Sequence, residues 1–268
     1  MNRIRSEDPG RTATAASTAA TNTDTDTCPR RIMDQTSEKF EERYRLGQKL
    51  VEQLGTVGTD PSTFELLGKE WDLVPGTYAP RPGTGTEWYT GAVPYPTGGR
   101  FLEIGCGAGV TAVWAALQGC AHVTATDITD TAVDSAVRNA KRHGVEDRVR
   151  VLRSDLFAEL DPDDRFDTVF WNCSVIEAPR DFEFTHDFEW AIFDRGYTAL
   201  GRYLSEVHDW LLPGGRALVT FNSLGDADRI AQLAVEANTS LNLLDSADRR
   251  LEGVDVTYKV FEIIPNSH

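Results

Sequence analysis

The sequence has no long apolar run and few cysteines. No stretch of about 18 apolar residues occurs, so we expect no membrane span and no membrane partner. The N-terminus lacks the apolar core of a secretory signal, and we therefore expect a cytoplasmic protein. The four cysteines, Cys28, Cys106, Cys120 and Cys173, show neither CxxC spacing nor an evident metal partner. We interpret them as reduced thiols and expect no metal site.

Basic residues are scarce relative to acidic ones. The chain has 27 Lys and Arg against 42 Asp and Glu, which gives a formal net charge of −15. Such a surface repels phosphate backbones at long range and disfavours binding to DNA or RNA. We therefore expect a small-molecule substrate and no nucleic-acid partner. The oligomeric state is unknown from the sequence.

Large apolar side chains are almost absent from residues 1–33, which we expect to form a disordered tail. Residues 34–98 are predicted to be a small N-terminal helical cap with a loop. Apolar residues recur at helical intervals from Thr36 to Leu54, and Ser62 with Glu65 forms a capping-box pair for a second helix through Leu67. The Pro- and Gly-rich segment Pro80–Glu87 favours an ordered loop or β-edge over a helix. Residues 99–268 then form the main domain.

The stretch from Phe101 to Gly109 reads FLEIGCGAG. This pattern is typical of a strand, a tight turn and the start of a helix. Glycines permit positive φ and close approach of a ligand, while free amides at a helix start attract negative groups. The spacing is close to the dinucleotide fingerprint GxGxxG but differs from it, which argues against a dehydrogenase-like nicotinamide binder.

Strands and helices alternate after the glycine turn. Apolar β-rich runs at 121–126, 148–152, 166–171 and 217–221 alternate with helices expected at about 130–143, 197–211 and 226–237. Two further β-like runs, 241–244 and 254–264, are typical of a hairpin. The pattern predicts an α/β fold with a Rossmann-like, doubly wound, mainly parallel seven-stranded sheet and an antiparallel C-terminal hairpin.

Acidic residues at successive strand ends are candidates for cofactor binding, because ligands of doubly wound sheets bind there. Asp127 follows the glycines by about twenty residues, where an acid accepts hydrogen bonds from a ribose diol. Asp155 is placed to accept a hydrogen bond from an adenine amino group, with Ile128 or Leu156 packed on the ring. Each acid has an alternative role as a cap of the following helix.

The ordered set of motifs resembles class I S-adenosylmethionine-dependent methyltransferases. The set consists of Glu103 with the glycine turn, Asp127, the SDLF segment 154–157, the FDTVFWN strand 166–172 and the LPGG segment 212–215. The resemblance implies S-adenosyl-L-methionine as the cofactor and methyl transfer as the activity. The cofactor-binding residues it implies are Glu103, Gly105, Cys106, Gly107, Gly109, Asp127, Ile128, Asp155, Leu156 and Asn172.

More narrowly, the chain is similar to the branch with Asn-Pro-Pro-Tyr after the fourth strand, which includes the release-factor glutamine methyltransferases. The PRPxTxxE-like segment 80–87 adds to this similarity. In that branch the Asn accepts a hydrogen bond from the target nitrogen, so Asn172 is the catalytic candidate; a strand-end cap is its alternative role. This chain reads Asn172-Cys173-Ser174-Val175, so it lacks the Pro-Pro turn and the aromatic side chain of the motif. That departure argues against the release-factor glutamine as the acceptor.

Aromatic and acidic residues interleave between 181 and 190. Carboxylates and aromatic faces bind a cationic amine or guanidine, and such a loop can act as a lid. A half-exposed hairpin with solvated charges explains the same pattern. His186 is a candidate general base, with a plain surface residue as the alternative. The predicted substrate-binding residues are Tyr78, Trp171, Glu183, His186 and Asp194.

These observations predict a methyltransferase that N-methylates a small amine-, guanidine- or amide-bearing metabolite, for instance in specialised biosynthesis. The nitrogen attacks the methyl carbon in line, and the enzyme contributes orientation and desolvation. Two alternatives stay open. One is a protein glutamine N-methyltransferase, and the other is a non-catalytic partner subunit with a methyltransferase fold.

Overall fold

The computed structural model describes residues 29–55, 61–251 and 253–266. The chain divides into two units, Met1–Ser37 and Glu38–His268, and everything that follows concerns the second. Helix α1 (Pro29–Leu54) crosses the boundary between the units. The predicted disordered tail lies outside the described residues as far as residue 28, and its last five residues, 29–33, are helical.

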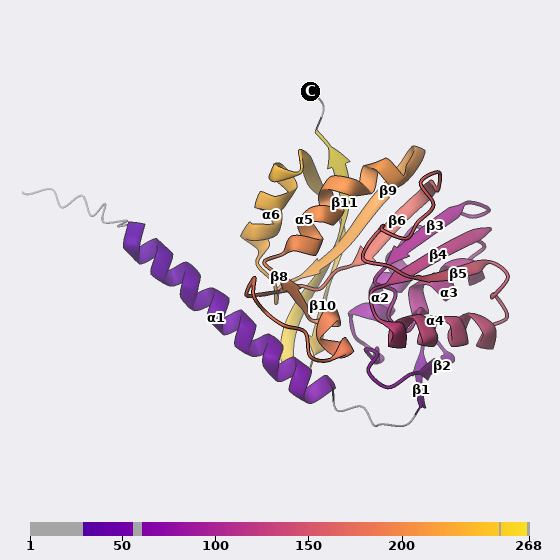
Figure 1. The fold of residues 1–268 in the computed structure, drawn as a ribbon, viewed down its shortest axis with the longest axis horizontal. Helices are drawn as coiled ribbons and strands as arrows, with labels where there is room; N and C mark the ends of the chain where they lie inside the picture. The colour runs from indigo at the N-terminus through magenta and orange to yellow at the C-terminus, as the bar shows by residue number, and fades with distance from the viewer. Residues whose placement is uncertain (1–28, 56–60, 252, 267–268) are drawn as a thin grey trace, which may run out of the picture. The chain divides into compact units, whose positions relative to one another are not determined.

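A seven-stranded sheet with the order β10-β11-β9-β6-β3-β4-β5 forms the centre of the second unit (Figure 1). Five strands of this sheet run parallel to one another: β3 (Arg100–Ile104), β4 (His122–Asp127), β5 (Val149–Arg153), β6 (Phe166–Asn172) and β9 (Leu211–Asn222). Strand β11 (Val254–Pro265) is antiparallel to both β9 and β10 (Thr239–Leu251). The predicted fold class, including the C-terminal hairpin, is confirmed.

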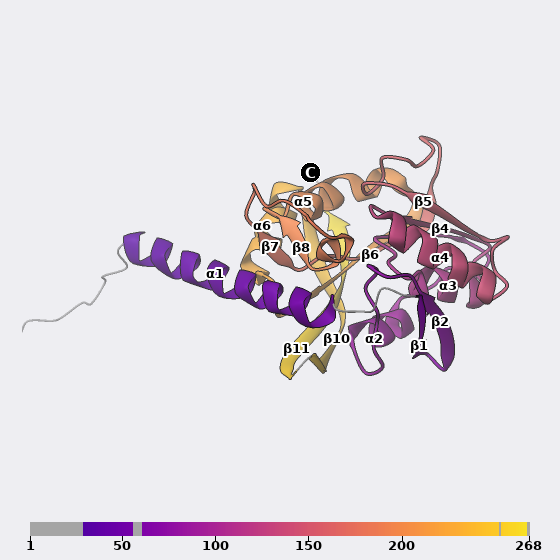
Figure 2. The same cartoon turned by 60° about the horizontal axis from the view of Figure 1, so that its bottom comes forward.

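Helices cover both faces of the sheet (Figure 2). On β3, Phe101 packs with residues of α3 (Val110–Leu117) and α4 (Asp130–Arg142). The next residue, Leu102, points to the opposite face and packs with residues of α5 (Thr198–Glu206) and α6 (Ala227–Glu236). Both side chains are fully buried. Burial on two faces explains why the parallel strands are apolar at nearly every position.

The strand order reverses beside β3. The chain adds β4 and then β5 on one side of β3, and places β6 and then β9 on the other. The connections that leave the carboxyl ends of β3 and β6 therefore diverge to opposite faces. This switch point is where open α/β sheets bind their ligands.

The segment 62–67, predicted to be a helix, is instead the first strand of a β-hairpin. Strand β1 (Ser62–Leu66) pairs with β2 (Lys69–Leu73). The two turn residues, Leu67 and Gly68, have φ of 54° and 67°, as a tight hairpin turn requires. Beyond the turn, Asp72 exchanges hydrogen bonds of 2.7 and 2.8 Å with the side-chain amide of Asn139 on α4. The turn and this packing outweigh the local capping-box signal.

A second helix begins inside the segment that was expected to be a loop. Helix α2 (Gly85–Ala92) starts within Pro80–Glu87, where the backbone N–H of Gly83 donates to Glu87 Oε2 at 2.6 Å. The expected helical cap is therefore one long helix, a hairpin and this short helix. Its domain boundaries stay predictions.

The helix expected at 197–211 is shorter than predicted. Helix α5 ends at Glu206, a 3-10 turn (Val207–Trp210) follows, and β9 begins at Leu211. The LPGG segment 212–215 lies inside β9. Among residues 29–55, 61–251 and 253–266, no helix is both long and apolar enough to cross a membrane. The cytoplasmic location stays a prediction.

The second half of α1 packs against a small parallel pair of strands, β7 (Ile176–Ala178) and β8 (Phe193–Arg195). Gly47 permits this approach, because a Cβ there would lie 2.4 Å from Phe193 Cε1 and 3.1 Å from Ile176 Cγ2. Leu50 and Leu54, further along α1, join the same apolar cluster. Helix α1 is therefore a part of the main unit from Glu38 onward.

Replacing Gly47 with Ala is expected to lower the free energy of unfolding by about 1–3 kcal/mol, because the new methyl group overpacks the Phe193 ring. Gly91 in α2 is the matched control, since a Cβ there meets no atom within 4 Å. Gly91→Ala should be neutral or slightly stabilising, as in any helix. Urea denaturation of both variants measures the difference. Equal stabilities would contradict the close packing of α1.

Candidate functional site

The glycine turn between β3 and α3 forms one wall of a cavity of about 450 Å³ at the switch point of the sheet. At Gly107, which has φ of 53°, a Cβ would meet nothing within 4 Å and would project into open space. At Gly109 a Cβ would lie 2.7 Å from Ala136 Cβ, so this glycine lets α3 and α4 approach each other. Gly107 therefore faces the cavity, whereas Gly109 does not line it and has a packing role.

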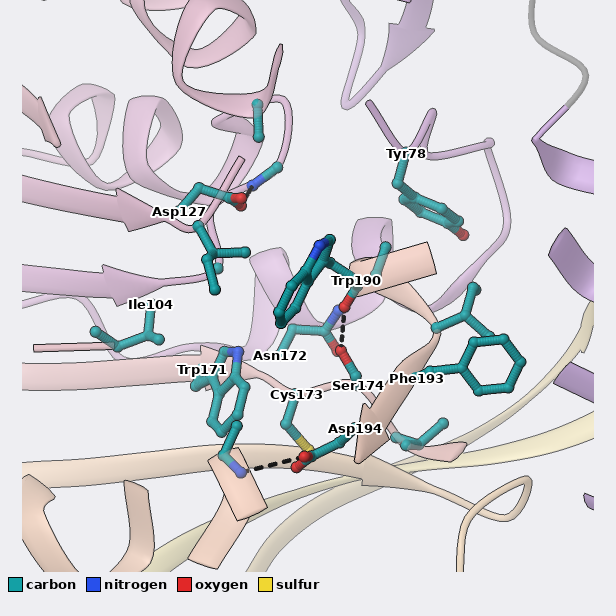
Figure 3. A pocket seen from close by; sticks show the side chains of 18 of the residues that line it. Tyr78, Ile104, Asp127, Trp171, Asn172, Cys173, Ser174, Trp190, Phe193 and Asp194 are labelled. Carbon is teal, nitrogen blue, oxygen red and sulfur yellow. Dashed lines mark hydrogen bonds between the residues drawn. The ribbon is translucent and has the colours of Figure 1, made fainter. Parts of the chain in front are cut away.

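Asp127 ends β4 at the side of the glycine turn (Figure 3). Its Oδ2 accepts a hydrogen bond from the backbone N–H of Gly107 at 2.9 Å, and its Oδ1 accepts two bonds of 3.0 Å from the N–H and hydroxyl of Thr129. Burial raises the pKa of Asp127, and these backbone donors oppose the rise. A carboxylate offers about four acceptor positions, so one on Oδ2 stays available to a ligand in the cavity.

Glu103 is a buried acid of the cavity with one unpartnered oxygen. Its side chain is 3 % exposed, and its Oε2 has no hydrogen-bond partner among the described residues. Burial raises the pKa of Glu103 to about 8, although the N–H of Ala112 and the hydroxyl of Thr111 lower it. A buried carboxyl with a free oxygen favours a cationic ligand group, which would restore its charge.

The segment after β5 forms the next wall. Leu156 is buried and has φ of 53°, and Ile128 lines the cavity beside it. Asp155 also lines the cavity, and its Oδ2 accepts a bond from Arg202 Nη1 at 2.8 Å. Two apolar side chains beside a carboxylate suit a flat, polar-edged ring such as adenine.

The end of β6 lies between the walls described so far and the aromatic part of the cavity, which is lined by Tyr78, Phe184, Phe188 and Trp190. In Figure 3, Trp190 lies between Asp127 on one side and Tyr78 on the other, with Asn172 and Trp171 below. Asn172 Oδ1 accepts a bond of 2.5 Å from the hydroxyl of Thr220 on the neighbouring strand β9. This contact fixes the amide plane of Asn172 and leaves one lone pair of its oxygen available.

Side-chain hydrogen bonds also fix the two residues that follow Asn172. Cys173 Sγ donates to the carbonyl of Thr220 at 3.1 Å, and burial raises the pKa of this thiol. The hydroxyl of Ser174 donates to the carbonyl of Trp190 at 2.6 Å. These bonds fix the chain that leaves β6 in the absence of the Pro-Pro turn.

Most of the predicted residues come together in one cavity. Those that line it are Tyr78, Glu103, Gly105, Cys106, Gly107, Asp127, Ile128, Asp155, Leu156, Trp171, Asn172 and Asp194. Glu183 and His186 do not line it and are exposed. Asp194 caps α5, since it accepts bonds from the N–H groups of Ala199 and Leu200 at 3.1 and 2.9 Å. The roles of these residues toward a ligand stay predictions.

Sequence reasoning missed the residues that reach the cavity from distant segments. Leu50 and Leu54 come from α1, Tyr258 comes from β11, and Arg180 and Arg195 flank the loop between β7 and β8. No local motif marks them. The described residues contain no group of three or more His, Cys, Asp or Glu side chains arranged for a metal ion.

The fold is the Rossmann-like fold that the sequence predicts, in keeping with the resemblance to class I methyltransferases. A family model described as a methyltransferase domain matches residues 101–187, which include the glycine turn, Asp127 and Asn172. The predicted class is thereby confirmed. The chain carries a methyltransferase domain and resembles the branch that includes the release-factor glutamine methyltransferases. The match to a methyltransferase domain also supports S-adenosyl-L-methionine as the cofactor.

Two curated relatives illustrate the similarity. A release factor glutamine methyltransferase from Rhodopirellula baltica is 36% identical over 113 residues, which are 42% of this chain and 33% of that protein. A ribosomal protein L11 methyltransferase from Symbiobacterium thermophilum is 44% identical over 66 residues, or 25% of this chain and 22% of that protein. The chain thus spans a third or less of the length of these relatives.

Solved structures share the fold at low identity. One is the 16S rRNA N2 G1207 methyltransferase from T. thermophilus, in complex with AdoMet and guanosine, with a TM-score of 0.54 at 18% sequence identity. The matched region covers 77% of this chain and 50% of that chain. Another is the tRNA m1G37 methyltransferase from M. jannaschii, with a TM-score of 0.52 at 14% sequence identity. The matched region covers 78% of this chain and 57% of that chain.

The comparisons correct the prediction about partners. We expected a small-molecule substrate and no nucleic acid. The relatives are instead named for release factor, ribosomal protein and, among the structures, rRNA methylation, so that prediction is wrong. Net charge describes the whole surface of a protein, whereas a methyl acceptor is chosen by the local cavity.

The raised pKa of Glu103 predicts a pH-dependent stability. A folded-state pKa of about 8, above the usual 4.5, gives a contribution that is full below pH 4.5 and is lost as the pH rises through about 8. Glu103→Gln, which mimics the protonated carboxyl, should therefore raise the free energy of unfolding at pH 9 by about 1–3 kcal/mol relative to the wild type. The exposed Glu146 provides the control variant, Glu146→Gln. Denaturation at pH 5 and pH 9 checks this, and an unchanged pH profile in Glu103→Gln would contradict it.

Proposed function

We propose that the chain is an S-adenosylmethionine-dependent methyltransferase that methylates a side-chain nitrogen of a protein. The observation that carries the proposal is the arrangement of Glu103, Asp127 and Asn172 along one cavity. The first two fit the cofactor, and the third fits an acceptor nitrogen. The curated relatives named for proteins support a protein acceptor.

The residues present fit the cofactor on physical grounds. The unpartnered Oε2 of Glu103 suits an α-ammonium group, and the remaining acceptor position of Asp127 suits a ribose hydroxyl. Gly107 leaves room for close approach along the turn. When bound, S-adenosylmethionine supplies an electrophilic methyl group on a sulfonium.

Asn172 provides the geometry for the acceptor. Thr220 occupies one lone pair of the Asn172 oxygen, and the other can accept an N–H of the acceptor. That bond would turn the nitrogen lone pair toward the methyl carbon, which is a positioning effect. Trp171 and Trp190 beside Asn172 exclude water from this part of the cavity.

The size of the cavity favours an acceptor that enters as a side chain. A volume of about 450 Å³ is near the lower end of the range that holds one drug-sized ligand. The cofactor would occupy most of it, so that the space beyond Asn172 admits a group of side-chain size. A protein presents such a group while the rest of its chain stays outside.

Incubation with radiolabelled S-adenosylmethionine tests this function. Ribosomal proteins and rRNA, separated from each other, serve as acceptors together with a recombinant release factor. We expect label in a protein fraction with the purified chain alone. Label in rRNA alone would contradict the protein acceptor, and cofactor binding without any transfer would support the non-catalytic subunit instead.

Asn172→Ala should lower kcat by about a hundredfold, because the acceptor loses its orienting hydrogen bond. The affinity for S-adenosylhomocysteine should stay within about twofold, since Glu103 and Asp127 are intact. Asn242→Ala, at an exposed position on the edge strand β10, is the control and should keep the wild-type kcat. An unchanged kcat in Asn172→Ala would refute the role of Asn172.

A further inference from the structure

Two arginines from the neighbouring strand ends of β7 and β8 line the cavity. Arg180 follows β7 and Arg195 ends β8, and these strands pair in parallel with Ala178 opposite Arg195. The side chain of Arg180 runs along Gly196, because a Cβ on that glycine would lie 3.0 Å from Arg180 Cγ and 3.6 Å from its Cζ. Both arginines line the cavity.

Neither Arg180 nor Arg195 has a carboxylate partner within the described part of the chain. Both side chains are exposed, and Arg180 acts on a carboxylate only at longer range, where it opposes the rise that burial causes in the pKa of Glu177. The third arginine of the cavity, Arg202, differs, since it pairs with Asp155 at 2.8 Å and with Glu206 at 3.4 Å. Two guanidinium groups that line one cavity and form no ion pair with a described residue favour an anionic ligand group.

Aromatic rings hold one of the two guanidinium groups in place. Phe184 and Trp190 stack with their ring centroids 3.6 Å apart. The Cζ of Arg195 lies 5.2 Å from the centroid of Phe184 and 5.9 Å from that of Trp190. This cation–π contact orients the planar fork of donors without using any of its N–H groups.

Two of the acidic residues between β7 and β8 accept hydrogen bonds from groups other than the arginines. Glu189 accepts bonds from the backbone N–H groups of Thr185 and His186 at 2.6 and 3.1 Å. Asp187 accepts a bond from the hydroxyl of Thr131 at 3.0 Å. Asp187 also lines the cavity, but this bond holds its carboxylate toward α4, and Glu183 does not line the cavity.

We propose that Arg180 and Arg195 form a subsite for a carboxylate of the acceptor protein, carried by an acidic residue close to the methylated one. This inference rests on the proposed methylation of a protein. Guanidinium forks bind carboxylates through paired charge-assisted hydrogen bonds. The relatives named for release-factor and ribosomal-protein methylation favour an acidic peptide over RNA as the source of this anionic group.

Synthetic pentapeptides with a central glutamine test the subsite. One set carries a single glutamate at each flanking position in turn, and the matched set carries glutamine there. Calorimetry on protein saturated with S-adenosylhomocysteine measures binding, and label transfer from S-adenosylmethionine measures kcat/KM. We expect at least one glutamate peptide to bind about tenfold more tightly than its neutral match.

Arg180→Gln and Arg195→Gln should each reduce that preference to about twofold or less, and Arg195→Lys should restore it only in part because lysine lacks the planar fork. Arg138→Gln removes the same charge from the exposed face of α4 and should keep the preference. The affinity for S-adenosylhomocysteine should not change in any of these variants.

The outcomes separate this inference from the proposed function. A glutamate preference in binding that the two arginines control, without methyl transfer to any peptide, supports the subsite and refutes glutamine as the acceptor group. Equal binding of both peptide sets, or no binding at all, overturns the subsite. A preference that survives both arginine variants, or tighter binding of an RNA oligonucleotide that both variants abolish, overturns it as well.

Discussion

The hydrogen bonds of Asp127 join the ends of three neighbouring strands, and the cofactor cavity depends on them. The side chain accepts from Gly107 in the turn after β3 and from Thr129 at the start of α4. Its backbone carbonyl accepts from the N–H of Ser154, after β5, at 2.7 Å. Because one residue satisfies donors from each neighbour, the glycine turn keeps its shape before any ligand binds. Such preorganisation reduces the entropy lost on binding.

An acidic group and two basic groups then mark different parts of the cavity. Glu103 is a buried acid with a free oxygen beside the glycine turn, whereas Arg180 and Arg195 are exposed bases that line the cavity. Asn172, held by Thr220, belongs to the strand end between Asp127 and the aromatic part of the cavity. A cofactor with an ammonium group and an acceptor with a carboxylate are thereby directed to different parts of the cavity, with the transferred methyl group between them.

The sequence predicted the parts of this arrangement that follow from local pattern and strand direction. Asp127, Asp155 and Asn172 were identified because parallel strands place their carboxyl ends at one edge of a sheet. The hairpin at 62–73 was missed because its turn and its packing on α4 outweigh a local capping signal. The arginines were missed for a related reason. Which side chains of a loop face a cavity depends on the pairing of β7 with β8, and no local spacing encodes that pairing.

The most direct test of the account is calorimetric titration of the protein with S-adenosylhomocysteine at pH 7, in two buffers that differ in ionisation enthalpy. Free Glu103, with a pKa of about 8, is mostly protonated at this pH. An ammonium group at its free oxygen lowers that pKa, so the account predicts binding with release of a proton, and weaker binding without that release in Glu103→Gln. Absence of binding, or wild-type binding whose enthalpy is the same in both buffers, would contradict the account.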